Sequence, residues 1–156
     1  MADSVDPIQL IVAYRLNGAN FRASAEKLAR EIEVDERGRP TKLTAIPAFY
    51  LASHAAELYL KAALLKCNMS DSELRRIDVR HNLSALLDLL LSKNVQISTR
   101  TMELVRGLSK QHGEHALRYT VLVDDGKRTY WPSFTVLFSS LDELLLLTRT
   151  TTQQPS

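Results

Sequence analysis

The chain has 156 residues, enough for one domain with a buried core, and its formal net charge is +2. This charge is too small to indicate a dedicated nucleic-acid-binding protein, and no apolar run is long enough to span a bilayer. The N-terminus lacks the basic start and apolar run of a secretory signal, and Cys67 is the only cysteine. We therefore expect a reducing, cytoplasmic location, no internal disulfide and no membrane contact.

The first predicted helix begins at Asp6-Pro7, a capping residue followed by proline at the first helical position. Apolar residues at helical spacing continue it to about Glu33. Asn17-Gly18 lies inside this pattern, where glycine can bend a helix. Residues 35–40 combine charges with glycine and proline and are predicted to form a solvated loop.

The segment from Pro47 to Leu65 is the strongest predicted helix, because it is rich in Ala and Leu and is uninterrupted by glycine. Most of its circumference is apolar, so we expect it at the centre of a helical domain. At about 100° per residue, four of its polar side chains fall within one narrow strip. The strip consists of Tyr50, His54, Glu57 and Lys61.

Two interpretations of this strip remain open. In the first, it is a narrow face toward solvent, where Glu57 and Lys61 form an ordinary i,i+4 ion pair that adds a few tenths of a kcal/mol. In the second, it is a polar seam in a shallow cleft or a dimer interface.

Further helices are predicted toward the C-terminus. Ser70 to Glu73 matches a capping box and opens a short helix. Asn82 is the expected N-cap of a helix from Leu83 to Lys93, whose leucines share one face. Another helix begins at Ser98 or Thr99 and runs to about Tyr119.

Asp125-Gly126 lies between apolar flanks and predicts a small hairpin or a protruding loop over residues 121–131. A last helix begins at Pro132 or Ser133, and the polar residues from Thr148 to Ser156 are expected to fray. The sequence thus predicts one all-α domain over residues 1–150 and a polar tail at 151–156. Its expected architecture is an antiparallel up-down bundle of four long helices plus one short helix, with the hairpin-like insertion before the last helix.

No Gly-rich phosphate loop, zinc-ligand spacing or nucleophile elbow is present, so we expect no cofactor and no metal site. His112 lies within an apolar helical face and is interpreted as a core histidine. His81 stands with Arg80 just before a helix N-terminus, where free N–H groups and the helix dipole favour an anion. Alternatively, these two residues belong to a loop that helps to cap the helix.

Residues 55–64, Ala-Ala-Glu-Leu-Tyr-Leu-Lys-Ala-Ala-Leu, are followed by Arg80-His81-Asn82-Leu83 and later by Leu117-Arg118-Tyr119. In their order and spacing these segments resemble the HEPN family, small helical domains associated with nucleotide or RNA binding. The resemblance covers about Ile46 to Tyr119. This chain has Arg-His-Asn-Leu where the family shows a Gly-His-Asp-Leu type of signature.

The resemblance implies a homodimer, and many HEPN proteins are metal-independent ribonucleases with an Arg-x(4–6)-His motif. In such a site the histidine takes the 2′-hydroxyl proton and the arginine steadies the phosphorane. Arg106 with His112 and Arg76 with His81 fit this spacing. However, Gly107 replaces the usual polar residue after Arg106, and the first pair points about 120° apart on a straight helix. The second pair precedes the late helix where the motif normally lies, so a non-catalytic member is favoured.

We therefore predict a cytoplasmic, homodimeric HEPN-like module that binds a nucleotide, RNA or protein partner without chemistry of its own. The basic side chains would contact phosphate or acidic groups, and Glu57 and His81 would position them. One alternative is a ribonuclease toxin of a toxin–antitoxin system, neutralised by a nucleotidyltransferase-type antitoxin. Another is a structural bundle whose strip faces water. The predicted ligand-binding residues are Glu57, Lys61, Arg80, His81, Arg118 and Tyr119.

Overall fold

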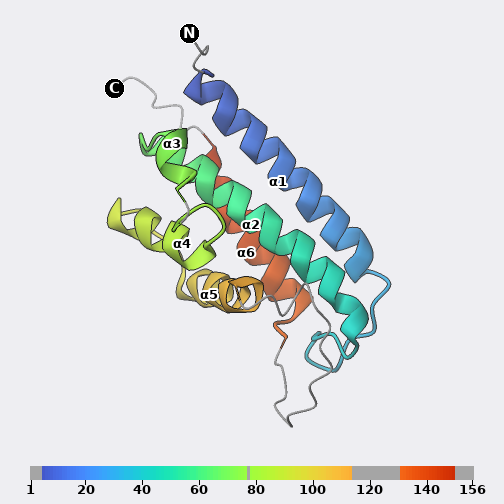
Figure 1. The fold of residues 1–156 in the computed structure, drawn as a ribbon. Helices are drawn as coiled ribbons and strands as arrows, with labels where there is room; N and C mark the ends of the chain where they lie inside the picture. The colour runs from blue at the N-terminus through green and yellow to red at the C-terminus, as the bar shows by residue number, and fades with distance from the viewer. Residues whose placement is uncertain (1–4, 77, 114–130, 150–156) are drawn as a thin grey trace, which may run out of the picture.

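The computed structural model of the chain describes residues 5–76, 78–113 and 131–149, without the side chains of 111–113. Within these ranges the protein is all-α, which confirms the predicted class, and no strand is formed (Figure 1). The described residues form six α-helices, one at each segment predicted in chain order, although the expected bundle counted only four long helices and one short helix. A 3₁₀ turn, η1 (Leu43–Ala45), precedes the second helix. The helices are α1 (Pro7–Ala29), α2 (Ile46–Lys66), α3 (Asp71–Leu74), α4 (Leu83–Ser92), α5 (Thr99–Gly113) and α6 (Phe134–Thr148).

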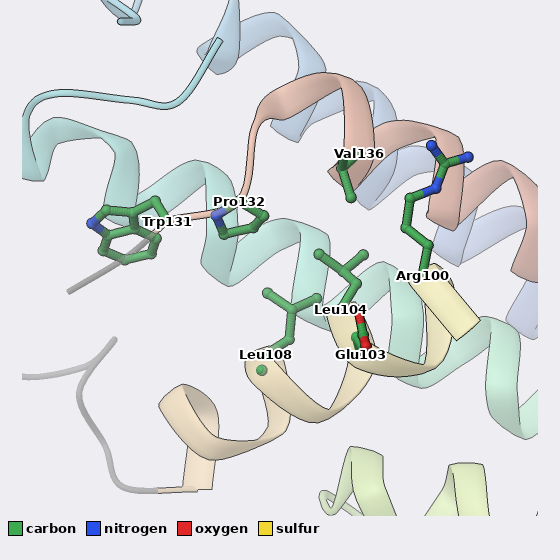
Figure 2. Close-up of a pocket in the computed structure, with 8 residues that line it drawn as sticks. Arg100, Glu103, Leu104, Leu108, Trp131, Pro132 and Val136 are labelled. Atoms are coloured by element: carbon green, nitrogen blue, oxygen red, sulfur yellow. The ribbon is translucent and has the colours of Figure 1, made fainter. Parts of the chain in front are cut away.

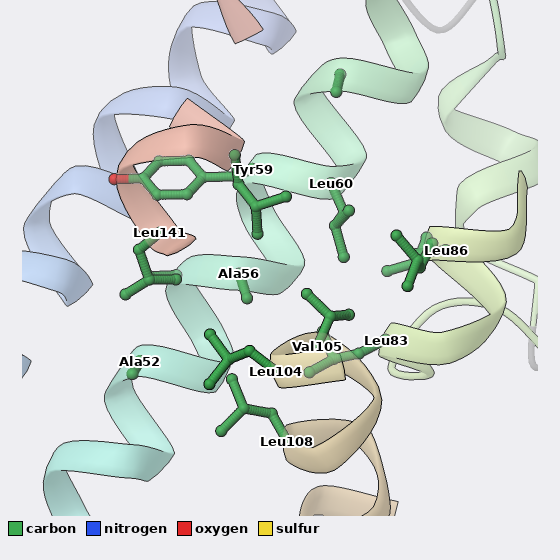
Figure 3. Packing of buried hydrophobic residues seen from close by; sticks show 14 of the residues in the cluster. Ala52, Ala56, Tyr59, Leu60, Leu83, Leu86, Leu104, Val105, Leu108 and Leu141 are labelled. Carbon is green, nitrogen blue, oxygen red and sulfur yellow. The ribbon is translucent and has the colours of Figure 1, made fainter. Parts of the chain in front are cut away.

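The central helix of the molecule is α2, as the sequence predicts. Fourteen of its 21 residues are buried, and it packs against α1, α4, α5 and α6. Figure 3 shows how leucine and valine side chains from α4, α5 and α6 surround the middle of this helix. The apolar circumference of α2 is therefore covered on several sides, which leaves little of the helix in contact with water.

The helix α1 runs unbroken through Asn17-Gly18 and ends at Ala29, earlier than the expected Glu33. Gly18 is buried, and a Cβ placed there would come within 2.6 Å of Cε1 of Tyr59. The glycine therefore lets α1 approach the buried Tyr59 ring closely.

Two neighbouring helices of the bundle, α2 and α6, run in the same direction. Rings of Phe49 and Phe134, near the N-terminal ends of α2 and α6, stack with centroids 5.6 Å apart. At the opposite ends, the Lys66 ammonium donates to the backbone carbonyl of Arg149. The two helices are therefore parallel, whereas α1 runs in the opposite direction beside α2 (Figure 1). Short connections favour antiparallel directions only for consecutive helices, and α2 and α6 are separated in sequence by α3, α4 and α5.

The connection between α1 and α2 is more structured than a solvated loop. The Asp35 carboxylate accepts a backbone hydrogen bond from Arg39 at 2.9 Å and pairs with its guanidinium at 2.8 Å. Gly38 adopts φ +71°, in the left-handed region that glycine enters at little steric cost, and its carbonyl accepts from the Phe134 N–H at 3.2 Å. This connection is thus tied to the start of α6.

Short-range capping signals match the helix starts. Ser70 and Glu73 form the predicted capping box of α3, and the Asn82 side chain accepts from the Ala85 N–H at 3.0 Å. Ser133 caps α6 by accepting from Val136 at 3.2 Å. These interactions lie within three residues of each cap, which is why the sequence reveals them.

The expectation of fraying from Thr148 onward is wrong for Thr148 itself. It is the last residue of α6, fully buried, and its hydroxyl donates to the Leu145 carbonyl at 2.7 Å.

Three predicted features lie outside the described residues: the tail at 151–156, the hairpin before Trp131 and the continuation of the helix to Tyr119. None of the helices in the described ranges has the length and apolarity needed to cross a lipid bilayer.

Candidate functional site

The polar strip of α2 contains a buried ion pair. Lys61 Nζ donates to Glu57 Oε1 at 2.6 Å, and the two residues are only 9% and 4% exposed. The interpretation of Glu57 and Lys61 as an ordinary exposed pair is therefore wrong. Removing two charges from water costs several kcal/mol per ion unless each finds a partner. Burial of this pair therefore carries a desolvation cost, and the fold holds both charges at one place.

His81 adds a third group to this pair. Its Nδ1 lies 3.1 Å from Glu57 Oε1, while its side chain remains 61% exposed. His81 stands just before α4, so the contact joins that loop to α2. Because Nδ1 faces the carboxylate, Nε2 on the far side of the ring is available to a molecule arriving from solvent.

His54 extends the row along α2. Its Nδ1 lies 3.9 Å from Glu57 Oε2, and its ring centroid lies 5.1 Å from that of Tyr50. The strip is therefore a continuous row of contacts, as the helical spacing predicts. We call the group formed by His54, Glu57, Lys61 and His81 the Glu57 cluster.

A second polar group lies close to this cluster. The Tyr14 hydroxyl donates to Asp71 Oδ1 at 2.8 Å, and Arg75 pairs with the same carboxylate at 2.5 Å. Burial, followed by the hydrogen bond and charge of Asp71, raises the pKa of Tyr14 to about 12, and the negative charge of Glu57 contributes. Tyr14 thus stays protonated at neutral pH and places an aromatic ring from α1 near the cluster.

Arg80 is exposed and forms no ion pair with any described residue. The N-terminus of α4, which follows Arg80, has fewer free N–H groups for an anion than the sequence predicts. The N–H of Ser84 donates to the Ser109 hydroxyl and that of Ala85 to Asn82, both at 3.0 Å. Because the chain itself satisfies these donors, any anion at this place would depend mainly on Arg80 and His81.

The alternative catalytic arginines each contact a carboxylate. Arg106 is exposed on α5 and pairs with Asp88 at 2.7 Å, whereas the side chain of its partner His112 is outside the description. Arg76 pairs with Asp78 at 3.1 Å, while His81 contacts Glu57. Among the described side chains, Arg76 and His81 therefore form no ion pair or hydrogen bond with each other.

Of the six predicted ligand-binding residues, Lys61 and His81 both contact Glu57, and Arg80 precedes His81 in the sequence. Arg118 and Tyr119 lie outside the described residues. Sequence reasoning missed the contact of Tyr14 with Asp71, because 57 residues separate the two and no motif links them. Only folding brings them together.

A second feature missed from the sequence is a pocket between α5, α6 and residues 131–132. The available signals were a glycine inside a helix and the single tryptophan of the chain.

Within the described part of the chain, no three His, Cys, Asp or Glu residues group as they would around a metal ion. In comparisons with known proteins, no protein-family model, no curated protein and no solved structure matches the chain.

Proposed function

We propose that this protein is a non-catalytic, HEPN-like module that binds a phosphate-bearing ligand, a nucleotide or RNA, at the Glu57 cluster. One observation carries the proposal: a buried carboxylate, Glu57, holds the Lys61 ammonium and at the same time orients the exposed imidazole of His81. Positioned groups of this kind, at the surface end of a buried polar network, are typical of binding sites.

The charges around the cluster suit an anion. When protonated, His81 can donate from Nε2 to a phosphate oxygen, and the neighbouring Arg80 adds a cation without an ion pair among the described residues. Arg75 is exposed and pairs with Asp71 at the surface. Exposed pairs of this kind contribute little stability, so Arg75 can exchange its carboxylate for a phosphate at small cost.

The contacts of Arg76 and His81 support binding without catalysis. Arg76 pairs with Asp78 while His81 contacts Glu57, so these two residues do not face each other as an arginine–histidine pair. A ribonuclease site needs an arginine that faces the reacting phosphate together with its histidine. The proposal also includes a homodimer, which the resemblance of residues 46–119 to the HEPN family supports, and a cytoplasmic location, which the single cysteine supports.

The test is a calorimetric titration of the full chain with AMP, ATP and a mixed-sequence RNA octamer. We expect binding of at least one of them, weakened about tenfold in His81→Gln and in Arg80→Met, because each change removes one charge-assisted hydrogen bond. Lys93→Met is the matched control, since Lys93 is also exposed but lies at the opposite end of α4.

Absence of binding to all three probes at millimolar concentration would contradict the proposal, as would an equal loss in the control variant. Incubation of the RNA with the wild-type chain provides a separate readout. RNA cleavage by the wild-type chain that is lost in His81→Gln would support the ribonuclease alternative and contradict a non-catalytic binding module.

A further inference from the structure

A pocket of about 520 Å³ lies between α5, the start of α6 and residues 131–132, and it shares no residue with the Glu57 cluster. Its volume lies within the range of small-molecule sites, about 300–1,000 Å³. Figure 2 shows Trp131 at one end of the pocket and Arg100 at the other. The walls between them are mainly apolar and come from Leu104, Leu108, Pro132 and Val136.

The indole of Trp131 is held in place by the core. Its ring centroid lies 4.4 Å from that of Phe49, which is fully buried in α2. Trp131 itself is half-buried and lines the pocket. A rigid indole of this kind offers a favourable surface to another aromatic ring, since aromatic pairs gain energy beyond the area that they bury.

Gly107 lines the same pocket from α5. A glycine inside a helix makes that helix less stable than an alanine would. A Cβ at this position would meet no atom within 4 Å, so packing among the described residues does not require a glycine here. A ligand that lies close to the α5 backbone would require a glycine at this position.

Two charged residues of α5, Arg100 and Glu103, line the pocket and are exposed. Neither forms an ion pair with another described residue, although the positive charge of Arg100 helps to lower the pKa of Glu143. A ligand anion would be attracted by Arg100 and repelled by Glu103. Its favoured position is therefore the Arg100 end, away from Trp131.

We propose that this pocket binds a planar aromatic ligand that carries an anionic group, with its ring against Trp131 and its anion at Arg100. A nucleoside monophosphate and an aromatic carboxylic acid share this chemistry. The inference does not depend on the function proposed for the Glu57 cluster, because the two sites have no residue in common.

Trp131 is the only tryptophan of the chain, so its fluorescence, excited at 295 nm, reports directly on the pocket. We expect a saturable change with AMP or with phenylacetate, and roughly tenfold weaker binding of the matched neutral compounds adenosine and phenylacetamide. Preference for AMP would identify a nucleotide site, and preference for phenylacetate would identify a site for aromatic acids. No change with either acid at millimolar concentration would overturn the proposal.

Substitutions on α5 provide the second part of the test. Arg100→Gln should weaken binding of the acid about tenfold and leave that of its neutral counterpart unchanged, while Glu103→Gln should strengthen binding of the acid about twofold. Arg106→Gln is the matched control, because Arg106 is an exposed arginine of α5 that does not line the pocket. An equal effect in this control would overturn the proposal.

Gly107→Leu should fill the pocket and abolish the fluorescence response. Because a Cβ at Gly107 meets open space, this variant and Gly107→Ala should both remain folded, which circular dichroism can verify. Binding of unchanged affinity by folded Gly107→Leu would contradict the assigned pocket.

Discussion

At the scale of single residues, the buried pair of Glu57 and Lys61 makes the strongest energetic demand on the fold. Removal of one partner leaves a charge in the interior with less compensation, whereas removal of both leaves none. Lys61→Met alone should therefore lower the free energy of unfolding by about 3 kcal/mol. The double variant Glu57→Leu with Lys61→Met should cost less than either single change. Urea unfolding of Lys61→Met, of Glu57→Leu and of the double variant measures the three free energies of unfolding. Costs of the single changes that simply add in the double variant would contradict a coupled pair.

Two helical glycines are expected to respond in opposite directions to alanine. Gly18→Ala should destabilise by about 1–3 kcal/mol, because the new methyl group would lie 2.6 Å from the buried Tyr59 ring and force α1 or the ring to move. Gly107→Ala should stabilise by about 0.5–1 kcal/mol, because it removes the helix penalty of glycine without a clash. Thermal unfolding compares the two directly, and a change of the same sign in both would show that the contact of Gly18 with Tyr59 is not decisive.

At the scale of elements, Glu143 fastens the start of α5 to α6. The backbone N–H and the hydroxyl of Ser98 both donate to its carboxylate at 2.7 Å, and the Thr101 hydroxyl donates as well. Burial opposes ionisation, but the hydrogen bonds from Ser98 and Thr101 prevail and lower the pKa of Glu143. The ionised carboxylate therefore supplies the cap that joins the two helices.

Because this pKa is lower in the folded chain than in the unfolded chain, the stabilisation is present above the unfolded value of about 4.3 and is lost as the pH falls through the folded value. Glu143→Gln should cost about 1–2 kcal/mol at pH 7 and progressively less below about pH 4. Urea unfolding at pH 7, 4 and 3 measures this dependence. Glu103→Gln, which removes an exposed carboxylate from α5, is the control, and a cost for Glu143→Gln that does not vary with pH would contradict the account.

At the scale of the whole molecule, the sequence predicts what local interactions determine. The caps Asp6, Ser70 and Asn82 act within three residues, and the apolar circumference of α2 requires burial wherever the helix is placed. The contact of His54, Glu57 and Lys61 follows from helical spacing in the same way.

What the sequence could not predict depends on distant segments. The parallel course of α2 and α6, the hydrogen bond from Tyr14 to Asp71 and the burial of Thr148 all arise from tertiary packing. The contact of His81 with Glu57 is of the same kind, since helical spacing on α2 gives no information about a loop 24 residues away. For the candidate site, the sequence therefore supplied Glu57, Lys61, Arg80 and His81 as members, and tertiary packing supplied the contact of His81 with Glu57 and the nearby hydrogen bond of Tyr14.

The parallel pairing of α2 and α6 has a consequence for biosynthesis. A ribosome completes α2 when α6 is still untranslated, so the nascent α2 has no partner for the side on which Leu137, Leu141 and Leu144 will lie. Before translation reaches this last helix, the growing polypeptide has an apolar stripe that chaperones can recognise. Its native packing is thus acquired only after α6 has left the ribosome.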